Sequence, residues 1–215
     1  MTAAATTTGA VTGALRGRLL SFTDAPAGPG GGAGYVFHED GVLLVEDGRI
    51  AAAGPAGALL GRLPAGVAVD HYPDALIVPG FIDPHIHFPQ TQVIASYGTQ
   101  LLDWLNTYTF PAEQRYADPA HAAVHAAFFV DELLRNGTTA AVCYGSVHPQ
   151  SVDALFAAAE ARGMGLVAGK VMMDRNAPPA LTDTAERGYA ESRALIRRWH
   201  GRGRQRYAVT PRFAI

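Results

Sequence analysis

The sequence predicts an α/β chain in two parts, a β-sandwich-like subdomain over residues 1–78 and a parallel sheet with helices over residues 79–215. Two observations predict this division. Short apolar runs separated by glycine-containing turns fill the first part, a pattern typical of small antiparallel sheets. Strand-like and helix-like stretches then alternate to the end of the sequence, which favours right-handed βαβ crossovers and a parallel sheet.

In the first part, apolar runs predict strands over residues 19–23, 41–45, 49–54 and 67–72. The turn Glu46-Asp47-Gly48 joins the two middle runs and predicts a hairpin. Residues 25–34 are rich in Gly and Pro and too poor in apolar groups to pack, so they form a loop. We expect His38 and His71 to face solvent or to be hydrogen-bonded, because nothing in these strands indicates catalysis.

In the second part, apolar residues at helical spacing predict helices over residues 101–105, 118–136, 151–162 and 183–199. β-Branched and apolar runs predict strands over residues 138–144, 166–173 and 206–213. Asp118-Pro119 is a helix start with a capping acid, and Asn136-Gly137 is a helix stop. The pair Phe110-Pro111 is expected to break the first helical stretch.

The stretch from Leu76 to Gln90 carries the candidate chemistry. Its apolar first half predicts a buried strand entered through the turn Pro79-Gly80. Because side chains alternate along a strand, His85 and His87 point to one face and Ile86 points into the packing. Two imidazoles on one face are half of a tetrahedral zinc site, or part of a more open site for iron or manganese. The alternative is a packed or surface pair, but catalytic groups of parallel barrels lie at this end of their strands.

Composition limits the functions open to the chain. Its 215 residues are 48% hydrophobic and 17% charged, so it can bury a core and is neither disordered nor membrane-spanning. A net charge of −2, with both signs spread along the chain, argues against a nucleic-acid or membrane partner and favours a small molecule. The single Cys143 excludes an internal disulfide, and residues 1–15 lack a signal-peptide pattern, so we expect a cytoplasmic protein.

The number of predicted strands leaves the architecture of the second part open. About four strands follow Pro79, whereas a closed (β/α)8 barrel needs about eight strands and roughly 250 residues. Either the remaining strands lie in sequence not included here, or the part is a short, open, doubly wound sheet.

The run Pro79-Gly-Phe-Ile-Asp-Pro-His-Ile-His87 resembles the first-strand signature of the amidohydrolase superfamily, metal-dependent hydrolases on a (β/α)8 barrel with an N-terminal β-sandwich. Further blocks are similar to the guanine-deaminating branch of that superfamily. They are residues 87–91, 97–98, 101–111, 136–139, 169–174 and 210–213. The resemblance implies an α/β chain with about the first four β/α units of a TIM-type barrel.

The same resemblance implies zinc-dependent hydrolytic deamination of guanine to xanthine and ammonia. It implies one zinc ion, with His85 and His87 as ligands, and a homodimer as the full-length form. It also implies a purine site lined by His87, Phe88, Pro89, Gln90, Arg212 and Phe213.

The residue types suit a purine. Arg212 offers forked donors to a carbonyl and a ring nitrogen, Gln90 can donate and accept, and Phe213 offers an aromatic wall. On the residues alone, we favour the alternatives that Arg212 pairs with an acid, Gln90 caps a loop and Phe213 lies in the core.

The sequence also departs from the family. In the family, a further His, a His-x-x-Glu motif whose Glu moves protons, and an Asp ligand follow the Arg-Phe pair, whereas this sequence ends at Ile215. The catalytic proton-transfer residue is therefore expected beyond Ile215. Other histidines are weaker candidates. His148 follows a strand and could reach the pocket, whereas His200 is expected to be a cation at a helix end. His121 and His125 are expected to form a solvated pair on a helix.

Two other functions compete with this reading. One is a hydrolase of a cyclic amide with two metals bridged by a carboxylated lysine, for which Lys170, the chain's only lysine, is the candidate. The other is a non-catalytic truncated product that binds a partner through an open sheet edge.

Overall fold

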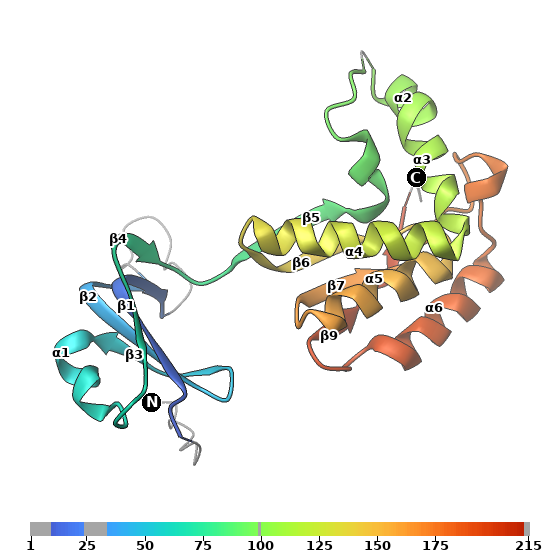
Figure 1. The fold of residues 1–215 in the computed structure, drawn as a ribbon. Helices are drawn as coiled ribbons and strands as arrows, with labels where there is room; N and C mark the ends of the chain where they lie inside the picture. The colour runs from blue at the N-terminus through green and yellow to red at the C-terminus, as the bar shows by residue number, and fades with distance from the viewer. Residues whose placement is uncertain (1–9, 24–33, 99, 213–215) are drawn as a thin grey trace. The chain divides into compact units, whose positions relative to one another are not determined.

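The computed structural model describes residues 10–23, 34–98 and 100–212 (Figure 1). The chain divides into two compact units, residues 1–79 and residues 80–215, and each is described by itself. Most of the predicted loop over residues 25–34 lies outside the described residues. No described helix is both long and apolar enough to cross a membrane.

The first unit is a four-stranded sheet in the order β3-β2-β1-β4. Its elements are β1 (Gly13–Phe22), β2 (Tyr35–Glu46), β3 (Arg49–Pro55), α1 (Ala56–Leu59) and β4 (Val69–Ile77). The predicted hairpin is confirmed, since β2 and β3 pair antiparallel. Its turn has positive φ at Asp47 (48°) and Gly48 (72°), as the right-handed twist of paired strands favours.

The expectation that all strands of this unit are antiparallel is wrong for β4, which pairs parallel with β1. The reason is the helical connection through α1, which returns the chain so that β4 runs in the direction of β3 and β1. A small core of Ala14, Val42, Leu44, Ala56 and Leu59 lies between α1 and the sheet. The described residues of this unit form one sheet, and the second layer of a sandwich stays a prediction.

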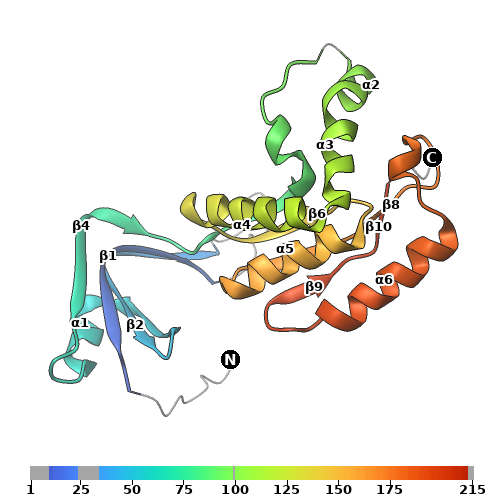
Figure 2. The ribbon, with the colours of Figure 1, turned by 45° about the vertical axis from the view of Figure 1, so that its right-hand side comes forward.

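The second unit contains the predicted parallel sheet, in the order β5-β6-β7-β9. Its strands are β5 (Phe81–His87), β6 (Thr138–Tyr144), β7 (Gly165–Gly169) and β9 (Gln205–Tyr207). Three long helices alternate with them, α4 (Pro119–Arg135), α5 (Pro149–Ala161) and α6 (Ala185–Trp199). The helices lie side by side over one face of the sheet (Figures 1 and 2). The predicted alternation of strand and helix is confirmed.

The ends of α4 form for the reasons that the sequence indicates. Asp118 Oδ1 accepts a hydrogen bond from the backbone N–H of Ala120 (2.9 Å), and Pro119 occupies the first helical position, where it has no N–H to lose. Gly137 follows the helix with φ of 82°, a conformation that glycine adopts without strain.

Two local predictions are wrong. The helical stretch does not break at Phe110-Pro111, because α2 (Leu101–Trp104) continues through a π-helical turn, η3 (Leu105–Thr109), into α3 (Phe110–Gln114). π-Helical turns are rare and occur mostly as single turns inside α-helices, which is the arrangement here.

The last two predicted strands are each divided. The chain beyond β7 and β9 forms a separate parallel pair, β8 (Val171–Met172) and β10 (Thr210–Pro211). A Cβ at Gly169 would overlap the carbonyl oxygen of Ala208, so only glycine allows this close approach of the two backbones.

The predicted burial of the strand before His85 is also wrong. Phe81 is 61% exposed and Ile82 is 70% exposed. Among the described strands β5 pairs only with β6, and it therefore stands at the edge of the sheet. Ile86 does pack against the hydrophobic core, as predicted.

A buried ion cluster fastens the end of β7 to the last helix. Lys170 is fully buried, and its ammonium group contacts Asp183 and lies 2.9 Å from Glu191 Oε2. Arg187 Nε also donates to Asp183 Oδ1 (2.6 Å). Burial alone would raise the pKa of Asp183, but hydrogen bonds from Lys170 and Arg187 outweigh it and hold that pKa below its usual range.

We predict that Asp183→Asn lowers the free energy of unfolding by about 3 kcal/mol at pH 7, because it leaves a buried lysine short of a carboxylate. The folded-state pKa is depressed, so this stabilisation is present above the unfolded-state pKa of about 3.9 and is lost as the pH falls through the folded value. Urea unfolding between pH 3 and pH 7 should show the two proteins converging at low pH. The control Asp131→Asn removes the more exposed pair with Arg162 and should cost less than about 1 kcal/mol. Equal losses in the two variants would contradict this account.

Candidate functional site

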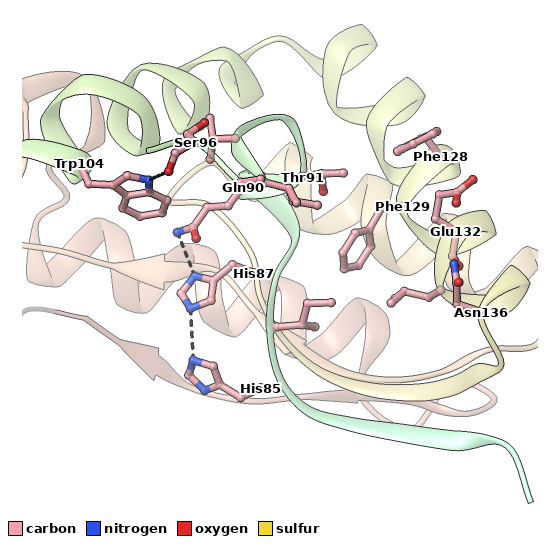
Figure 3. Close-up of a pocket in the computed structure, with 15 residues that line it drawn as sticks. His85, His87, Gln90, Thr91, Ser96, Trp104, Phe128, Phe129, Glu132 and Asn136 are labelled. Carbon is pink, nitrogen blue, oxygen red and sulfur yellow. Dashed lines mark hydrogen bonds between the residues drawn. The ribbon is translucent and has the colours of Figure 1, made fainter. Parts of the chain in front are cut away.

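His85 and His87 converge at the C-terminal end of β5, as the alternation of strand side chains predicts. Their Nε2 atoms are 3.4 Å apart and their ring centroids are 5.2 Å apart. The ring of His87 also stacks on Tyr144 of the neighbouring strand, with centroids 4.6 Å apart. Figure 3 shows His85, His87 and Gln90 in one row. The prediction that the two imidazoles share one side of the strand is confirmed.

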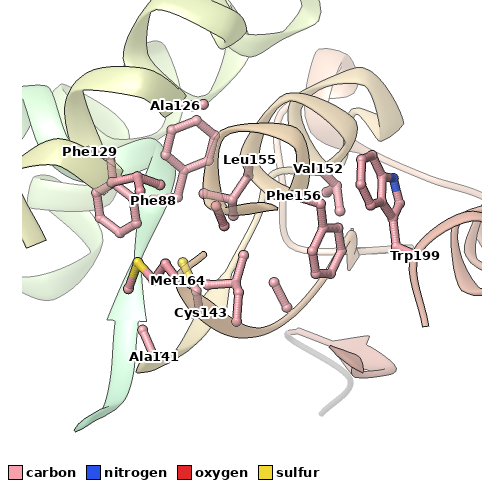
Figure 4. Packing of buried hydrophobic residues seen from close by; sticks show 14 of the residues in the cluster. Phe88, Ala126, Phe129, Ala141, Cys143, Val152, Leu155, Phe156, Met164 and Trp199 are labelled. Atoms are coloured by element: carbon pink, nitrogen blue, oxygen red, sulfur yellow. The ribbon is translucent and has the colours of Figure 1, made fainter. Parts of the chain in front are cut away.

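The chain on either side fixes this pair. Asp83 Oδ1 accepts a hydrogen bond from the backbone N–H of His85 (3.0 Å), and the register of β5 against β6 shifts between Asp83 and Ile86. Directly after His87, Phe88 is fully buried between Tyr116 and Phe129, with centroid distances of 4.8 and 5.4 Å (Figure 4). The aromatic anchor therefore holds the end of the strand from which His87 projects.

The environment of His87 favours a neutral imidazole. Burial, the positive charge of Arg212 and the neighbouring His85 together lower its pKa to about 4, and burial contributes most. A neutral ring keeps a nitrogen lone pair at pH 7, which is the form that binds metal ions.

Three segments meet at the carboxylate of Glu113, which is buried in α3. Gln90, in the 3₁₀ helix η2 (Phe88–Val93), donates from Nε2 to Glu113 Oε1 (3.1 Å). Arg212, directly after β10, donates from Nη1 to both carboxylate oxygens (3.0 and 2.9 Å). Gln90 Nε2 also lies 3.2 Å from His87 Nδ1, and because an amide nitrogen only donates, Nδ1 is the acceptor in this contact. The structure thus connects His87, Gln90 and Arg212, which the sequence predicts as site residues.

Sequence reasoning missed Glu113. The only signal for Glu113 is that it follows the aromatic Phe110 by three residues in a helical stretch, and the two residues therefore share one side of the helix. A charge on the buried side of a helix needs a partner. The partner, Arg212, is 99 residues away in sequence, and pairing with an acid was one of the two interpretations open for it.

A cavity of about 680 Å³ lies beside the two histidines. Its lining includes His85, His87 and Gln90, with Trp104 and Phe129 among its aromatic side chains (Figure 3). Most of its lining is apolar, and polar groups reach it from the end of β5, from η2 and from α4, which contributes Glu132. A mainly apolar lining with a few polar groups is usual for small-molecule sites.

Not every residue predicted for the purine site lines this cavity. Phe88 and Pro89 are buried and absent from its lining, and Phe88 belongs to the core, so the structure does not support their direct contact with a ligand. Arg212 borders a smaller cavity of about 190 Å³ and reaches the histidines through Glu113. Phe213 lies outside the described residues.

The weaker histidine candidates lie elsewhere. His148 stands before α5 and borders a separate cavity with Arg187 and Glu191. His121 and His125 are half-buried, with ring centroids 4.1 Å apart, rather than fully solvated. His200 Nδ1 accepts from the backbone N–H of Tyr207 (3.2 Å) and links the end of α6 to β9.

Lys170 does not fit the carboxylated lysine of a two-metal site. Its Nζ atom is fully buried and engaged by the carboxylates of Asp183 and Glu191, whereas a bridging carbamate requires an uncharged amine that faces the metals. The geometry therefore disfavours the cyclic-amide alternative.

His85 and His87 fit two positions of a zinc ligand set, because their Nε2 atoms face one another across a short gap. Within the described parts of the chain, no group of three or more His, Cys, Asp or Glu side chains is arranged to hold a metal ion. The donor set is thus nitrogen-rich and comprises two groups.

Comparison with known proteins identifies relatives over nearly the whole chain. The sequence profile of the amidohydrolase family matches residues 76–215. Guanine deaminase of Escherichia coli (strain K12) is 50% identical over 202 residues, which are 94% of this chain and 46% of that protein.

Solved structures agree with the sequence comparison. The structure of E. coli guanine deaminase has a TM-score of 0.88 at 49% identity, covering 94% of this chain and 47% of that chain. A guanine deaminase from C. acetobutylicum, solved with guanine bound in its active site, has a TM-score of 0.79 at 27% identity over 94% of this chain and 46% of that chain. The chain spans less than half the length of these relatives.

We predict that Phe88→Ala lowers the free energy of unfolding by about 3 to 5 kcal/mol, because it opens a cavity in a closely packed core. Phe88→Leu keeps most of the volume and should cost roughly 1 to 2 kcal/mol. Urea titration followed by circular dichroism measures both. Phe128, which is 51% exposed on the neighbouring helix, is the control, and Phe128→Ala should change stability by less than about 0.5 kcal/mol. A loss at Phe88 no larger than that at Phe128 would refute its role as an anchor.

Proposed function

This chain belongs to the amidohydrolase family, and we propose that it is part of an enzyme that hydrolyses guanine to xanthine and ammonia. The observation that carries the proposal is the row of His85, His87 and Gln90 at the end of the first strand of the parallel sheet. The similarity to guanine deaminases, one of them with guanine bound in its active site, supports guanine as the substrate.

The arrangement of the second unit supports a partial (β/α)8 barrel. In a barrel, every crossover helix lies on the outer face of one curved sheet, and α4, α5 and α6 lie over one face here (Figure 2). A doubly wound sheet would place helices on both faces. We therefore assign residues 79–215 to about the first four β/α units and residues 1–78 to an N-terminal β-sandwich-like subdomain.

We assign one zinc ion to the imidazoles of His85 and His87. When bound, zinc acts as a Lewis acid that makes water nucleophilic at neutral pH. The pair offers two neutral nitrogen donors, and a protein site of this kind usually has three or four ligands. The remaining ligands are expected from the family pattern beyond Ile215.

The chain's own groups would bind and orient the purine. Gln90 can donate and accept along the polar edge of the ring, and Arg212 can donate to a carbonyl oxygen. The apolar lining of the cavity would pack against the face of the ring. In the overall reaction, the oxygen of water replaces the amino group on the ring carbon, and the amino nitrogen gains a proton and leaves as ammonia. We leave the proton-transfer residue unassigned within this chain.

We further propose that the enzyme is cytoplasmic and that its full-length form is a homodimer. The single cysteine supports the first assignment.

We predict that the 215-residue chain alone does not turn over guanine, whereas the chain completed by downstream sequence, or by the C-terminal half of the E. coli relative, does. Loss of general acid-base help alone typically costs about a hundred- to ten-thousand-fold. Ammonia release and xanthine absorbance, measured with added zinc, give two readouts of one reaction. Comparable turnover from the 215-residue chain would show that its own residues suffice.

We predict that the completed enzyme holds one zinc ion, loses activity on chelation and regains it with zinc. His85→Ala should weaken zinc binding by about a hundredfold or more, measured by competition with a chromophoric chelator, because it removes one of the ligands. His125→Ala removes a histidine of the α4 pair and is the matched control, which should retain the metal. Unchanged zinc affinity in the His85 variant would exclude it as a ligand.

A further inference from the structure

We infer that Glu113 is a positioning residue for purine binding, which holds Gln90 and Arg212 in the orientation that reads the ring. The inference rests on the proposed function and extends it to a residue that neither the sequence motifs nor the ligand assignments include. Glu113 is not part of the cavity lining, so it acts through its two partners rather than by touching the purine.

The burial of Glu113 is the first observation. Its side chain is 1% exposed and that of Arg212 is 10% exposed, so the ion pair is shielded from solvent. A buried carboxylate is costly unless a positive charge and hydrogen bonds compensate it. Here Arg212 supplies the charge and Gln90 a further donor, and both are groups assigned to the purine.

The contact with Glu113 holds the guanidinium of Arg212 at one of its three nitrogens. Both carboxylate oxygens bond the same terminal nitrogen, Nη1, at 3.0 and 2.9 Å. The backbone N–H of Arg212 also donates to the carbonyl of Met172 (2.9 Å), which continues the ladder between β10 and β8. Arg212 is therefore held at both its backbone and its head, and the rotamer freedom of a long side chain is lost before a ligand arrives.

The contact with Gln90 fixes the polarity of its amide. A carboxylate accepts hydrogen bonds and cannot donate them, so Glu113 Oε1 selects the NH₂ end of Gln90 (3.1 Å). The carbonyl end is thereby directed to other partners. An amide of fixed polarity distinguishes a ring edge that donates from one that accepts, which is a property needed to select among purines.

The three groups come from distant parts of the chain. Gln90 lies 23 residues before Glu113, and Arg212 lies 99 residues after it. The helix that carries Glu113 thus ties the turn after β5 to the end of β10, and a change at residue 113 should affect both purine contacts at once.

The test compares Glu113→Gln and Glu113→Asp in the completed enzyme, with guanine as substrate and zinc content measured in parallel. We expect Glu113→Gln to raise KM about tenfold or more, with a smaller change in kcat and with zinc retained. Glu113→Asp keeps the charge and should fall between the wild type and Glu113→Gln. In an Arg212→Met background, adding Glu113→Gln should raise KM by a smaller factor than it does in the wild type, because only the contact with Gln90 remains to be altered.

Asp153→Asn is the matched control. Like Glu113, Asp153 accepts hydrogen bonds from an arginine, Arg198, and from a second donor, the indole N–H of Trp199 (2.7 Å). These contacts join α5 to α6 and lie outside the proposed purine site. It should leave KM unchanged. An active wild type whose KM for guanine is the same in Glu113→Gln would overturn the inference. So would an equal rise of KM in Asp153→Asn, because the effect would then be one of general stability.

A measurement without turnover separates this inference from the proposed function. Thermal unfolding of the 215-residue chain in a double-mutant cycle of Glu113→Gln and Arg212→Met should give non-additive shifts in Tm. If Glu113→Gln does not fold, the cycle is run with Glu113→Asp. Additive shifts would overturn the inference even in an active enzyme, whereas a completed enzyme that leaves guanine intact would overturn only the proposed function.

Discussion

Parallel pairing of β5, β6, β7 and β9 is the constraint on which the candidate site depends. Parallel strands bring their carboxyl ends to one edge of the sheet, so residues far apart in sequence meet there without long loops. His87 is the last residue of β5. Arg212 directly follows β10, the short strand that comes after β9 in the chain. Helix α4 also lines the cavity, with Phe129 among its residues, but His121 and His125 of this helix contact one another and are not part of that lining.

In two clusters of the second unit, a buried charged side chain is surrounded by oppositely charged and hydrogen-bonding partners. A buried charge is tolerated when oppositely charged and hydrogen-bonding partners surround it. Lys170 meets two carboxylates between the end of β7 and α6, and this cluster fastens the last helix to the sheet. Glu113 meets Arg212 and Gln90 between α3 and the strand ends. The first cluster therefore belongs to the stability of the unit, whereas the second holds two side chains that we propose bind the substrate.

Local signals predicted the features that local chemistry determines. The cap at Asp118, the glycine stop at Gly137 and the convergence of His85 and His87 follow from residue type and strand alternation. Local signals in the sequence do not show which distant segments contact one another. The direction of β4 depends on the crossover before it, the exposure of β5 depends on its place at a sheet edge, and the burial of Phe88 depends on which face α4 covers. Glu113 was missed for the same reason, since its function depends on partners 23 and 99 residues away.

His87 joins the proposed metal set to the proposed purine set. Its Nε2 faces His85, and its Nδ1 faces Gln90, so one ring lies between the two groups. Hydrogen bonds to the far nitrogen of a histidine ligand orient the ring and tune its basicity. Gln90 is in turn held by Glu113, whose charge is balanced by Arg212. A purine that bonds to Gln90 would therefore act on a group in direct contact with the proposed ligand His87, and this short chain of contacts would couple the proposed purine site to the proposed metal site.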